Sequence, residues 1–194
     1  MRHDSIRDMI SEEWKQRRAF DIVEWHLNAT LAGNQPPPLR MILYGEGGTG
    51  KSKVIQTISA MFRAKGVYHT LQKTAYTGIA ASLIDGKTMH TLCGMSIQKK
   101  GKMTSEARRR LEEVWSNKMY LIIDECSMIG KSFLTKFASK IRCGRGRVED
   151  DDLWAGLSVI LCGDFHQFPP VAVVKDEHLY TPGDVDDEQN ERQV

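Results

Sequence analysis

The stretch G-E-G-G-T-G-K-S, from Gly45 to Ser52, decides the fold class that the sequence predicts. It follows a short apolar run, Arg40 to Tyr44, which is typical of a strand, and it leads into Lys51 to Lys65, where apolar residues recur at helical spacing. Glycines, a lysine and a serine at this spacing, between a strand and a helix, form the pattern of a phosphate-binding loop. A glycine-rich structural turn is the alternative, and the flanking strand and helix favour the phosphate site.

The same order of strand and helix continues outward from this loop. Further strands are predicted at the apolar runs Val67 to Lys73, Met119 to Ile123 and Leu157 to Cys162, and helices at Ser105 to Trp115 and Lys131 to Ile141. Strands that are apolar throughout and alternate with helices belong to parallel sheets with helices on both faces. The predicted fold class is therefore α/β, a three-layer sandwich with a mainly parallel sheet.

The two ends of the chain differ from this central pattern. A helix is predicted from Ser11 to about Leu27, with Trp14, Ile22 and Trp25 facing a core. The prolines of Gly33 to Arg40 would then form a stiff connector. The expected organisation is a helical segment at residues 1–32, one α/β domain at residues 33–174 and an acidic tail at residues 175–194 that is disordered or truncated.

Composition and charge exclude some classes of protein. With 41% hydrophobic and 27% charged residues, and no apolar stretch near the roughly 20 residues of a membrane span, we expect an intracellular globular protein without a membrane partner. The net charge of +2 does not by itself indicate nucleic-acid binding. Two basic clusters, Lys99 to Arg110 and Lys140 to Arg147, are either solvated faces or nucleic-acid contacts. The cysteines, without a C-x-x-C pair, predict free core thiols: Cys93, Cys126, Cys143 and Cys162.

The residue types of the loop fit phosphate chemistry. Backbone N–H groups of a glycine-rich loop can converge on phosphate oxygens, and the N-terminus of the following helix adds positive potential. Lys51 would place a charge on the β and γ phosphates, and the Ser52 hydroxyl would bind magnesium. The residues predicted to hold the nucleotide here are Gly45, Gly48, Thr49, Gly50, Lys51 and Ser52.

Two adjacent acids complete the predicted site. The stretch Y-L-I-I-D-E-C-S, from Tyr120 to Ser127, delivers Asp124 and Glu125 at the carboxyl end of an apolar strand, where open α/β sheets bind ligands. Asp124 would hold magnesium through water, and Glu125 would accept a proton from the attacking water. Acids after a strand also cap helices and are a weak signal alone, but together with Lys51 they predict nucleotide hydrolysis.

Two other classes of phosphate-loop enzyme fit less well. A GTPase would carry the pattern N-K-x-D, and Asn117 to Tyr120 begins this pattern but lacks the acid. A small-molecule kinase would have an arginine-rich lid, for which Arg142 to Arg147 is the candidate segment. The phosphate loop is shared among these classes, so the remaining motifs must discriminate between them.

Further motifs follow the second and fourth predicted strands. They are T-A-Y-T-G-I-A-A with G-K-T-M-H-T, within Thr74 to Thr91, and G-D-F-H-Q-F-P-P-V, which starts at Gly163, where glycine would let the chain turn tightly. With these the chain resembles the Pif-one-type DNA helicases of superfamily 1, related to RecD, and especially the helicase part of Helitron transposons. The resemblance covers Glu12 to Val173, begins with K-Q-R-R-A-F-D-I-V, and implies a RecA-like P-loop NTPase fold.

The resemblance implies an ATP-driven motor that moves 5′ to 3′ along single-stranded DNA and separates duplexes. It places Gln16 on the adenine, and Thr77, Gly78 and His90 on DNA phosphates, although a core or helix-capping role is the alternative for His90. Gln167 would sense the γ-phosphate through an uncharged amide. ATP and magnesium are the expected cofactors, with Lys51, Glu125 and Gln167 as catalytic residues.

In this family a second RecA-like domain supplies arginines to the ATP site. We expect that domain to be missing from this chain, which alone would hydrolyse ATP slowly and not translocate. A nuclear or mitochondrial protein of DNA repair, recombination, telomere maintenance or transposition is compatible with the resemblance. The alternatives are a nucleotide-dependent DNA-binding module without productive turnover and an unrelated phosphotransferase.

Overall fold

The computed structural model describes residues 2–94, 104–149, 151–164 and 179, with side chains from residue 14 onward. Helices and strands alternate along these residues, as the sequence predicts. The elements are α1 (Arg2–Leu31), β1 (Arg40–Tyr44), α2 (Lys51–Ala64), η1 (Tyr68–Thr70), β2 (Leu71–Ala75), α3 (Gly78–Leu83), β3 (Lys87–Thr88), α4 (Met89–Cys93), α5 (Ser105–Trp115), β4 (Tyr120–Asp124), η2 (Cys126–Met128), α6 (Lys131–Gly144) and β5 (Ser158–Gly163).

The strands form one sheet in the order β1-β5-β4-β2-β3. Every strand pair that the structure describes is parallel, which confirms the predicted class of sheet. The central strand β4 pairs with β5 on one side and β2 on the other, with Ile122 opposite both Ile160 and Lys73. The carboxyl ends of all these strands therefore meet at one edge, where the phosphate loop begins.

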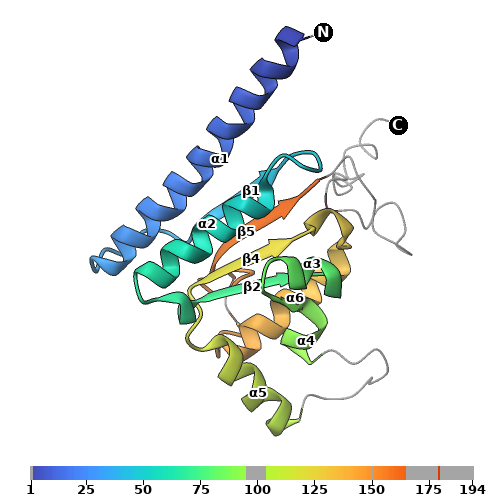
Figure 1. Ribbon diagram of the computed structural model, residues 1–194. Coiled ribbons are helices and arrows are strands. Elements are labelled where there is room, and N and C mark those ends of the chain that lie inside the picture. The colour runs from blue at the N-terminus through green and yellow to red at the C-terminus, as the bar shows by residue number, and fades with distance from the viewer. Residues whose placement is uncertain (1, 95–103, 150, 165–178, 180–194) are drawn as a thin grey trace, which may run out of the picture.

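Alternate side chains of β4 enter two separate cores, because successive residues of a strand point to opposite faces. Tyr120 and Ile122 are buried against α1 and α2, whereas Leu121 and Ile123 are buried against α4, α5 and α6. Figure 1 shows these two groups of helices on opposite faces of the sheet. The predicted three-layer sandwich is confirmed.

The helix α1 buries a different stripe from the one predicted. Trp14 is 59% and Trp25 65% exposed, and Ile22 is also exposed, so the expectation that these three residues face the core is wrong. The buried residues are instead Ala19, Val23, His26 and Leu27, which recur at intervals of three or four and pack on α2. Small and β-branched side chains let the two helices approach closely, whereas the indoles lie on the opposite side of α1.

Several element boundaries differ from the predictions. The second strand begins at Leu71 rather than Val67, because Tyr68–Thr70 forms a 3₁₀ turn first. The short elements α3, β3 and α4 were not predicted, since helices of six and five residues show no helical period and a strand of two residues shows no alternation. The signals for the two helices are threonines at their N-caps: the hydroxyls of Thr77 and Thr88 accept from backbone N–H groups of α3 and α4.

None of the four cysteines forms a disulfide, and Cys93, Cys126 and Cys162 are buried, as predicted. Cys143 is only half-buried, so the prediction of a core thiol is wrong for that residue. Among the described residues, no helix combines the length and the apolar character that crossing a membrane requires. The predicted sensor Gln167 and the predicted tail at residues 175–194, apart from residue 179, lie outside the described residues.

Candidate nucleotide site

The phosphate loop connects β1 to α2 at the carboxyl edge of the sheet. It starts where the Gly45 N–H donates to the Gly163 carbonyl at the end of β5 (3.3 Å). Gly48 and Gly50 have φ angles of 81° and 86°, a left-handed conformation that costs glycine little. The sequence pattern therefore forms the turn that brings backbone N–H groups to the N-terminus of α2.

A cavity of about 290 Å³ lies between this loop and the end of β4. It is lined by Gly47, Gly48, Gly50, Lys51, Ser52, Asp124 and Glu125. The tertiary structure thus brings the predicted lysine, serine and two acids into one cavity. Of the other predicted loop residues, Gly45 and Thr49 support the loop from outside this lining, and Gly47 lines the cavity without having been predicted.

The Lys51 side chain is bonded to the backbone of the phosphate loop. Its amine donates to the carbonyl oxygens of Gly45 (2.5 Å) and Glu46 (2.9 Å). An ammonium group has three N–H donors, so these two bonds fix the amine over the loop and leave one donor for a phosphate oxygen.

The two acids at the end of β4 have different environments. Asp124 is only 6% exposed, and burial raises the pKa of its carboxyl to about 6, with the Glu125 carboxylate acting in the same direction. The Glu125 N–H, which donates to Asp124 (3.0 Å), and the Lys51 amine partly oppose this increase in pKa. Glu125 itself has a φ of 53°, a strained conformation for a residue with a side chain, and such strain is concentrated at functional sites.

These residues fit magnesium. The Ser52 hydroxyl and the Asp124 and Glu125 carboxylates offer oxygen ligands in one cavity. Burial removes water from the Asp124 carboxylate and raises its pKa, and a bound cation would favour its ionised form. Among the described residues, no cluster of three or more His, Cys, Asp and Glu side chains could hold a metal. Magnesium is usually held by one or two carboxylates together with waters and phosphates, so the small ligand set is compatible with it.

Gln16, on α1, reaches the phosphate loop from the other side. Its amide nitrogen donates to the Thr49 carbonyl oxygen. A cavity of about 510 Å³ opens beside it between α1 and α2, and is lined by Gln16, Arg17, Phe20, Lys53, Val54 and Thr57. Sequence reasoning missed Phe20, although its spacing of four residues from Gln16 on a predicted helix was a usable signal. A flat base could lie in this cavity next to the loop.

The residues predicted to contact DNA lie at the same edge of the sheet. Thr88 and Asp124 both pair with Ala75, at the ends of β3, β4 and β2, so the three strands end in register. Thr77 caps α3, accepting from the Ala80 N–H (3.2 Å), and its hydroxyl hydrogen is free to donate to another acceptor.

Gly78 and His90 have contrasting surroundings. A Cβ added at Gly78 would meet nothing within 4 Å, so the protein interior does not require glycine there. The half-buried His90 ring lies 4.8 Å from the Phe133 ring and 5.6 Å from the Tyr76 ring, between centroids. His90 therefore has a packing role, whether or not it also contacts DNA.

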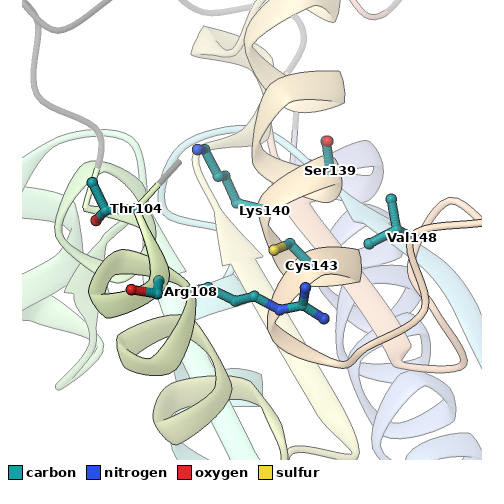
Figure 2. Close-up of a pocket in the computed structure, with 7 residues that line it drawn as sticks. Thr104, Arg108, Ser139, Lys140, Cys143 and Val148 are labelled. Carbon is teal, nitrogen blue, oxygen red and sulfur yellow. The ribbon is translucent and has the colours of Figure 1, made fainter. Parts of the chain in front are cut away.

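The two basic clusters do not form a comparable site in the described residues. On α5 the arginines pair with acids one turn away, for example Arg108 with Glu112 at 3.0 Å, which supports their interpretation as a solvated helix face. A cavity of about 510 Å³ between α5 and α6 contains Arg108 and Lys140 (Figure 2) but none of the predicted site residues.

The candidate kinase lid has a structural role instead. Arg145 donates to the carbonyl oxygens of Trp115, Lys118 and Ala155. Trp115 and Lys118 precede β4, so this arginine lies at the amino edge of the sheet, opposite the phosphate loop. Its position argues against a lid over the phosphates.

Comparisons with known proteins agree with this geometry. A family model described as "PIF1-like helicase" matches residues 14–179. The chain is 34% identical over 151 residues to the ATP-dependent DNA helicase PIF1 of Xenopus laevis, a match that covers 75% of this chain and 21% of that protein. It is 37% identical over 138 residues to the ATP-dependent DNA helicase RRM3 of Saccharomyces cerevisiae, covering 69% of this chain and 18% of that one.

Solved structures show the same similarity. The Pif1 helicase from Candida albicans matches with a TM-score of 0.59 and 30% identity, over 80% of this chain and 34% of that one. Pif1 from Bacteroides, in complex with ADP-AlF3 and single-stranded DNA, matches with a TM-score of 0.58 and 26% identity, over 80% of this chain and 34% of that one. The chain therefore has the fold of a RecA-like helicase domain and spans about a fifth of the length of the curated relatives (21% and 18%).

Proposed function

Because the chain belongs to the PIF1-like helicase family, we propose that it is the first RecA-like, ATP-binding domain of an ATP-dependent DNA helicase that moves 5′ to 3′ along single-stranded DNA. The observation that carries this proposal is that the cavity of Lys51, Asp124 and Glu125 lies at the same sheet edge as the threonine-capped segments after β2 and β3. Nucleotide and DNA would thus meet the same strand ends. A domain at residues 33–174, extended by the helix within residues 1–32, is part of this proposal.

The residues of the cavity have separate roles in ATP hydrolysis. Loop N–H groups and the Lys51 amine bind the β and γ phosphates, and the lysine compensates charge as the terminal phosphoryl group leaves. Glu125 accepts a proton from the attacking water, a step that typically contributes about 10² to 10⁴ in rate. Its backbone conformation, with a φ of 53°, turns the residue out of the strand direction at this edge.

Magnesium, when bound, would supply positive charge that stabilises the phosphate oxygens during transfer of the terminal phosphoryl group. The Ser52 hydroxyl and the Asp124 carboxylate would hold it, Asp124 through water. Gln16 and Phe20 would receive the adenine in the cavity between α1 and α2. For Gln167 we propose two roles, as a sensor of the γ-phosphate and as a catalytic residue.

DNA is the proposed partner on the same edge, with Thr77, Gly78 and His90 as contacts. A helix-capping hydroxyl and exposed backbone N–H groups are typical phosphate contacts, which fix the position of a strand without reading its sequence. A second RecA-like domain would complete the ATP site with arginines, and stepping requires it. Nuclear or mitochondrial DNA is the substrate that we propose.

ATP binding by the chain is the first test. Titration of magnesium and a fluorescent ATP analogue should give saturable binding, which Lys51→Ala should weaken by about 10- to 100-fold, because hydrogen bonds to charged groups contribute about 1.5–3 kcal/mol. Lys65→Ala, which removes the same charge at the far end of α2, should change the affinity less than twofold. Equal effects of the two substitutions would contradict the proposed site.

The helicase part of the proposal needs DNA. Single-stranded DNA should raise ATP hydrolysis by a protein that joins this chain to the remaining family domains, and this protein should unwind duplexes with a 5′ tail in preference to those with a 3′ tail. Unwinding from the 3′ tail would refute the direction. Transfer of phosphate to an acceptor other than water would indicate a phosphotransferase instead.

A further inference from the structure

The side chain of Gln16 contacts the phosphate loop at two successive residues. Its amide nitrogen, Nε2, donates to the Thr49 carbonyl oxygen. The next residue, Gly50, lies against the same amide: a Cβ added at Gly50 would be 2.5 Å from Nε2 and 3.0 Å from Cδ of Gln16. Since a carbonyl oxygen only accepts, the nitrogen end of the amide must face the loop.

This contact acts on the peptide that joins Thr49 to Gly50. On one side of it the Thr49 N–H and hydroxyl donate to the Glu46 carbonyl oxygen, and on the other the Gly50 carbonyl oxygen accepts from the N–H groups of Lys53 and Val54. Gly50 has no side chain and a φ of 86°, so rotation of the Thr49–Gly50 peptide would cost less there than at any residue with a Cβ. The peptide is trans, as is every peptide bond that the structure describes. In a trans peptide the C=O and N–H bonds point in opposite directions. A Thr49 carbonyl held toward α1 therefore directs the Gly50 N–H away from α1.

The direction of that N–H matters because Gly50 lines the cavity of about 290 Å³ that also contains Lys51, Asp124 and Glu125. Backbone N–H groups in such loops bind anions only when several of them converge. The restraint from Gln16 fixes one of these donors before any ligand arrives.

The support behind Gln16 is rigid. The helix α1 is anchored to α2 and the sheet by Ala19, Val23 and Leu27, all buried. Gln16 lies one helical turn before Ala19, so its side chain extends from a fixed backbone. It contacts Gly50, and glycine is the residue type with the most conformational freedom. The energetic effect of one hydrogen bond is small in general, but this one is made to the Thr49 carbonyl oxygen itself, the group whose direction sets that of the Gly50 N–H.

We propose that Gln16 is a positioning residue of the phosphate loop, orienting the Thr49–Gly50 peptide for phosphate binding independently of any base. This inference rests on the proposed function and deepens it. An amide nitrogen carries two hydrogens, so Gln16 can hold Thr49 with one while the other, and its Oε1, remain for an adenine. The same side chain then links the base cavity to the phosphate cavity.

The test separates loop positioning from base recognition by leaving the base out. In nucleotide-free protein, the NMR order parameter of the Gly50 N–H should fall from about 0.85 to below about 0.6 in Gln16→Ala and in Gln16→Glu. The glutamate variant keeps the size of the side chain and has no N–H donor when ionised, so a loss of packing cannot explain its effect. Thr135→Ala, on the exposed surface of α6 and outside both cavities, should leave the order parameter unchanged.

Affinity for magnesium tripolyphosphate, which has no base, gives the second measurement. Gln16→Ala should weaken tripolyphosphate binding about fivefold, the equivalent of one hydrogen bond, and Thr135→Ala should not. An unchanged Gly50 order parameter with unchanged tripolyphosphate affinity, and weaker binding of ATP alone, would overturn the positioning role and leave the proposed function standing. If the wild-type chain bound neither ligand, the proposed function itself would fail.

Discussion

The hydrogen bond between His26 and Tyr120 should be one of the main anchors of α1 on the sheet. His26 Nδ1 lies 2.6 Å from the Tyr120 hydroxyl, and His26 Nε2 lies 3.0 Å from the Pro37 carbonyl oxygen. Because the carbonyl can only accept, Nε2 carries the hydrogen in a neutral ring, and Nδ1 accepts from the tyrosine. Both side chains are buried, at 5% and 1% exposure.

Tyr120→Phe removes the donor and leaves Nδ1 of His26 buried without a partner. An unsatisfied buried polar atom costs about 1–3 kcal/mol, more than the net value of an average hydrogen bond. The aromatic packing should survive, since the Tyr120 ring contacts Phe62 and His26 edge to face, at 5.0 and 5.6 Å between centroids. The substitution therefore isolates the polar contribution, and the free energy of unfolding should fall by about 1–3 kcal/mol.

Urea denaturation measures this change, with Tyr68→Phe as the matched control. The Tyr68 hydroxyl bonds to the exposed Asp85 at 3.1 Å, so water can replace it, and the loss should stay within about 0.5 kcal/mol. In a His26→Ala background, Tyr120→Phe should cost at least about 1 kcal/mol less than in the wild type. Equal losses at the two tyrosines, or no coupling to His26, would refute the reasoning.

Three further predictions concern the site and the sheet. Glu125→Gln should leave ATP binding within about threefold but lower DNA-stimulated hydrolysis at least about 10²-fold, because an amide cannot accept the proton; steady-state kinetics with full activity would exclude Glu125 as the base. Gly163→Ala should lower the free energy of unfolding by about 1–3 kcal/mol in urea, because the new methyl carbon would lie 2.8 Å from Cys126 Sγ and 3.2 Å from its backbone nitrogen. Burial raises the pKa of Asp152, but bonds from backbone N–H groups and Arg40 outweigh it and lower the pKa. A carboxyl whose pKa is lower in the folded than in the unfolded protein contributes to the free energy of unfolding above the unfolded pKa, which is about 3.9. This contribution is lost as pH falls through the folded pKa. Between about pH 5 and 2, the free energy of unfolding should therefore fall less in Asp152→Asn than in the wild type.

The nucleotide site illustrates what a sequence can predict. The phosphate loop, Lys51, Ser52 and the two acids at the end of β4 were identified because each depends on neighbours in the chain: a strand that ends, a glycine turn, a helix that begins. Parallel strands then bring their carboxyl ends to one edge whatever the details of packing. The cavity that contains Lys51 and Asp124 follows from these local facts.

Gly163 and Gln16 show where sequence reasoning was incomplete. Glycine at position 163 was expected to permit a tight turn, but the structure gives it another reason: β5 passes so close to η2 that a methyl group would meet Cys126. Gln16 was assigned to the adenine by family resemblance, and its bond to Thr49, 33 residues away, has no signal in either motif. Both are contacts between segments that the chain order does not relate.

The sequence by itself determined the type and order of the elements and the chemistry of the phosphate loop. These depend on backbone sterics, capping and side-chain period over a few residues, all of which are readable locally. Only the tertiary structure decided which stripe of α1 is buried, with Val23 inside and Trp14 and Trp25 outside, and that Gln16 meets Gly50. The reason is physical: two apolar stripes on a helix are equivalent until a neighbour such as α2 fits one of them more closely, and close packing is a property of both surfaces.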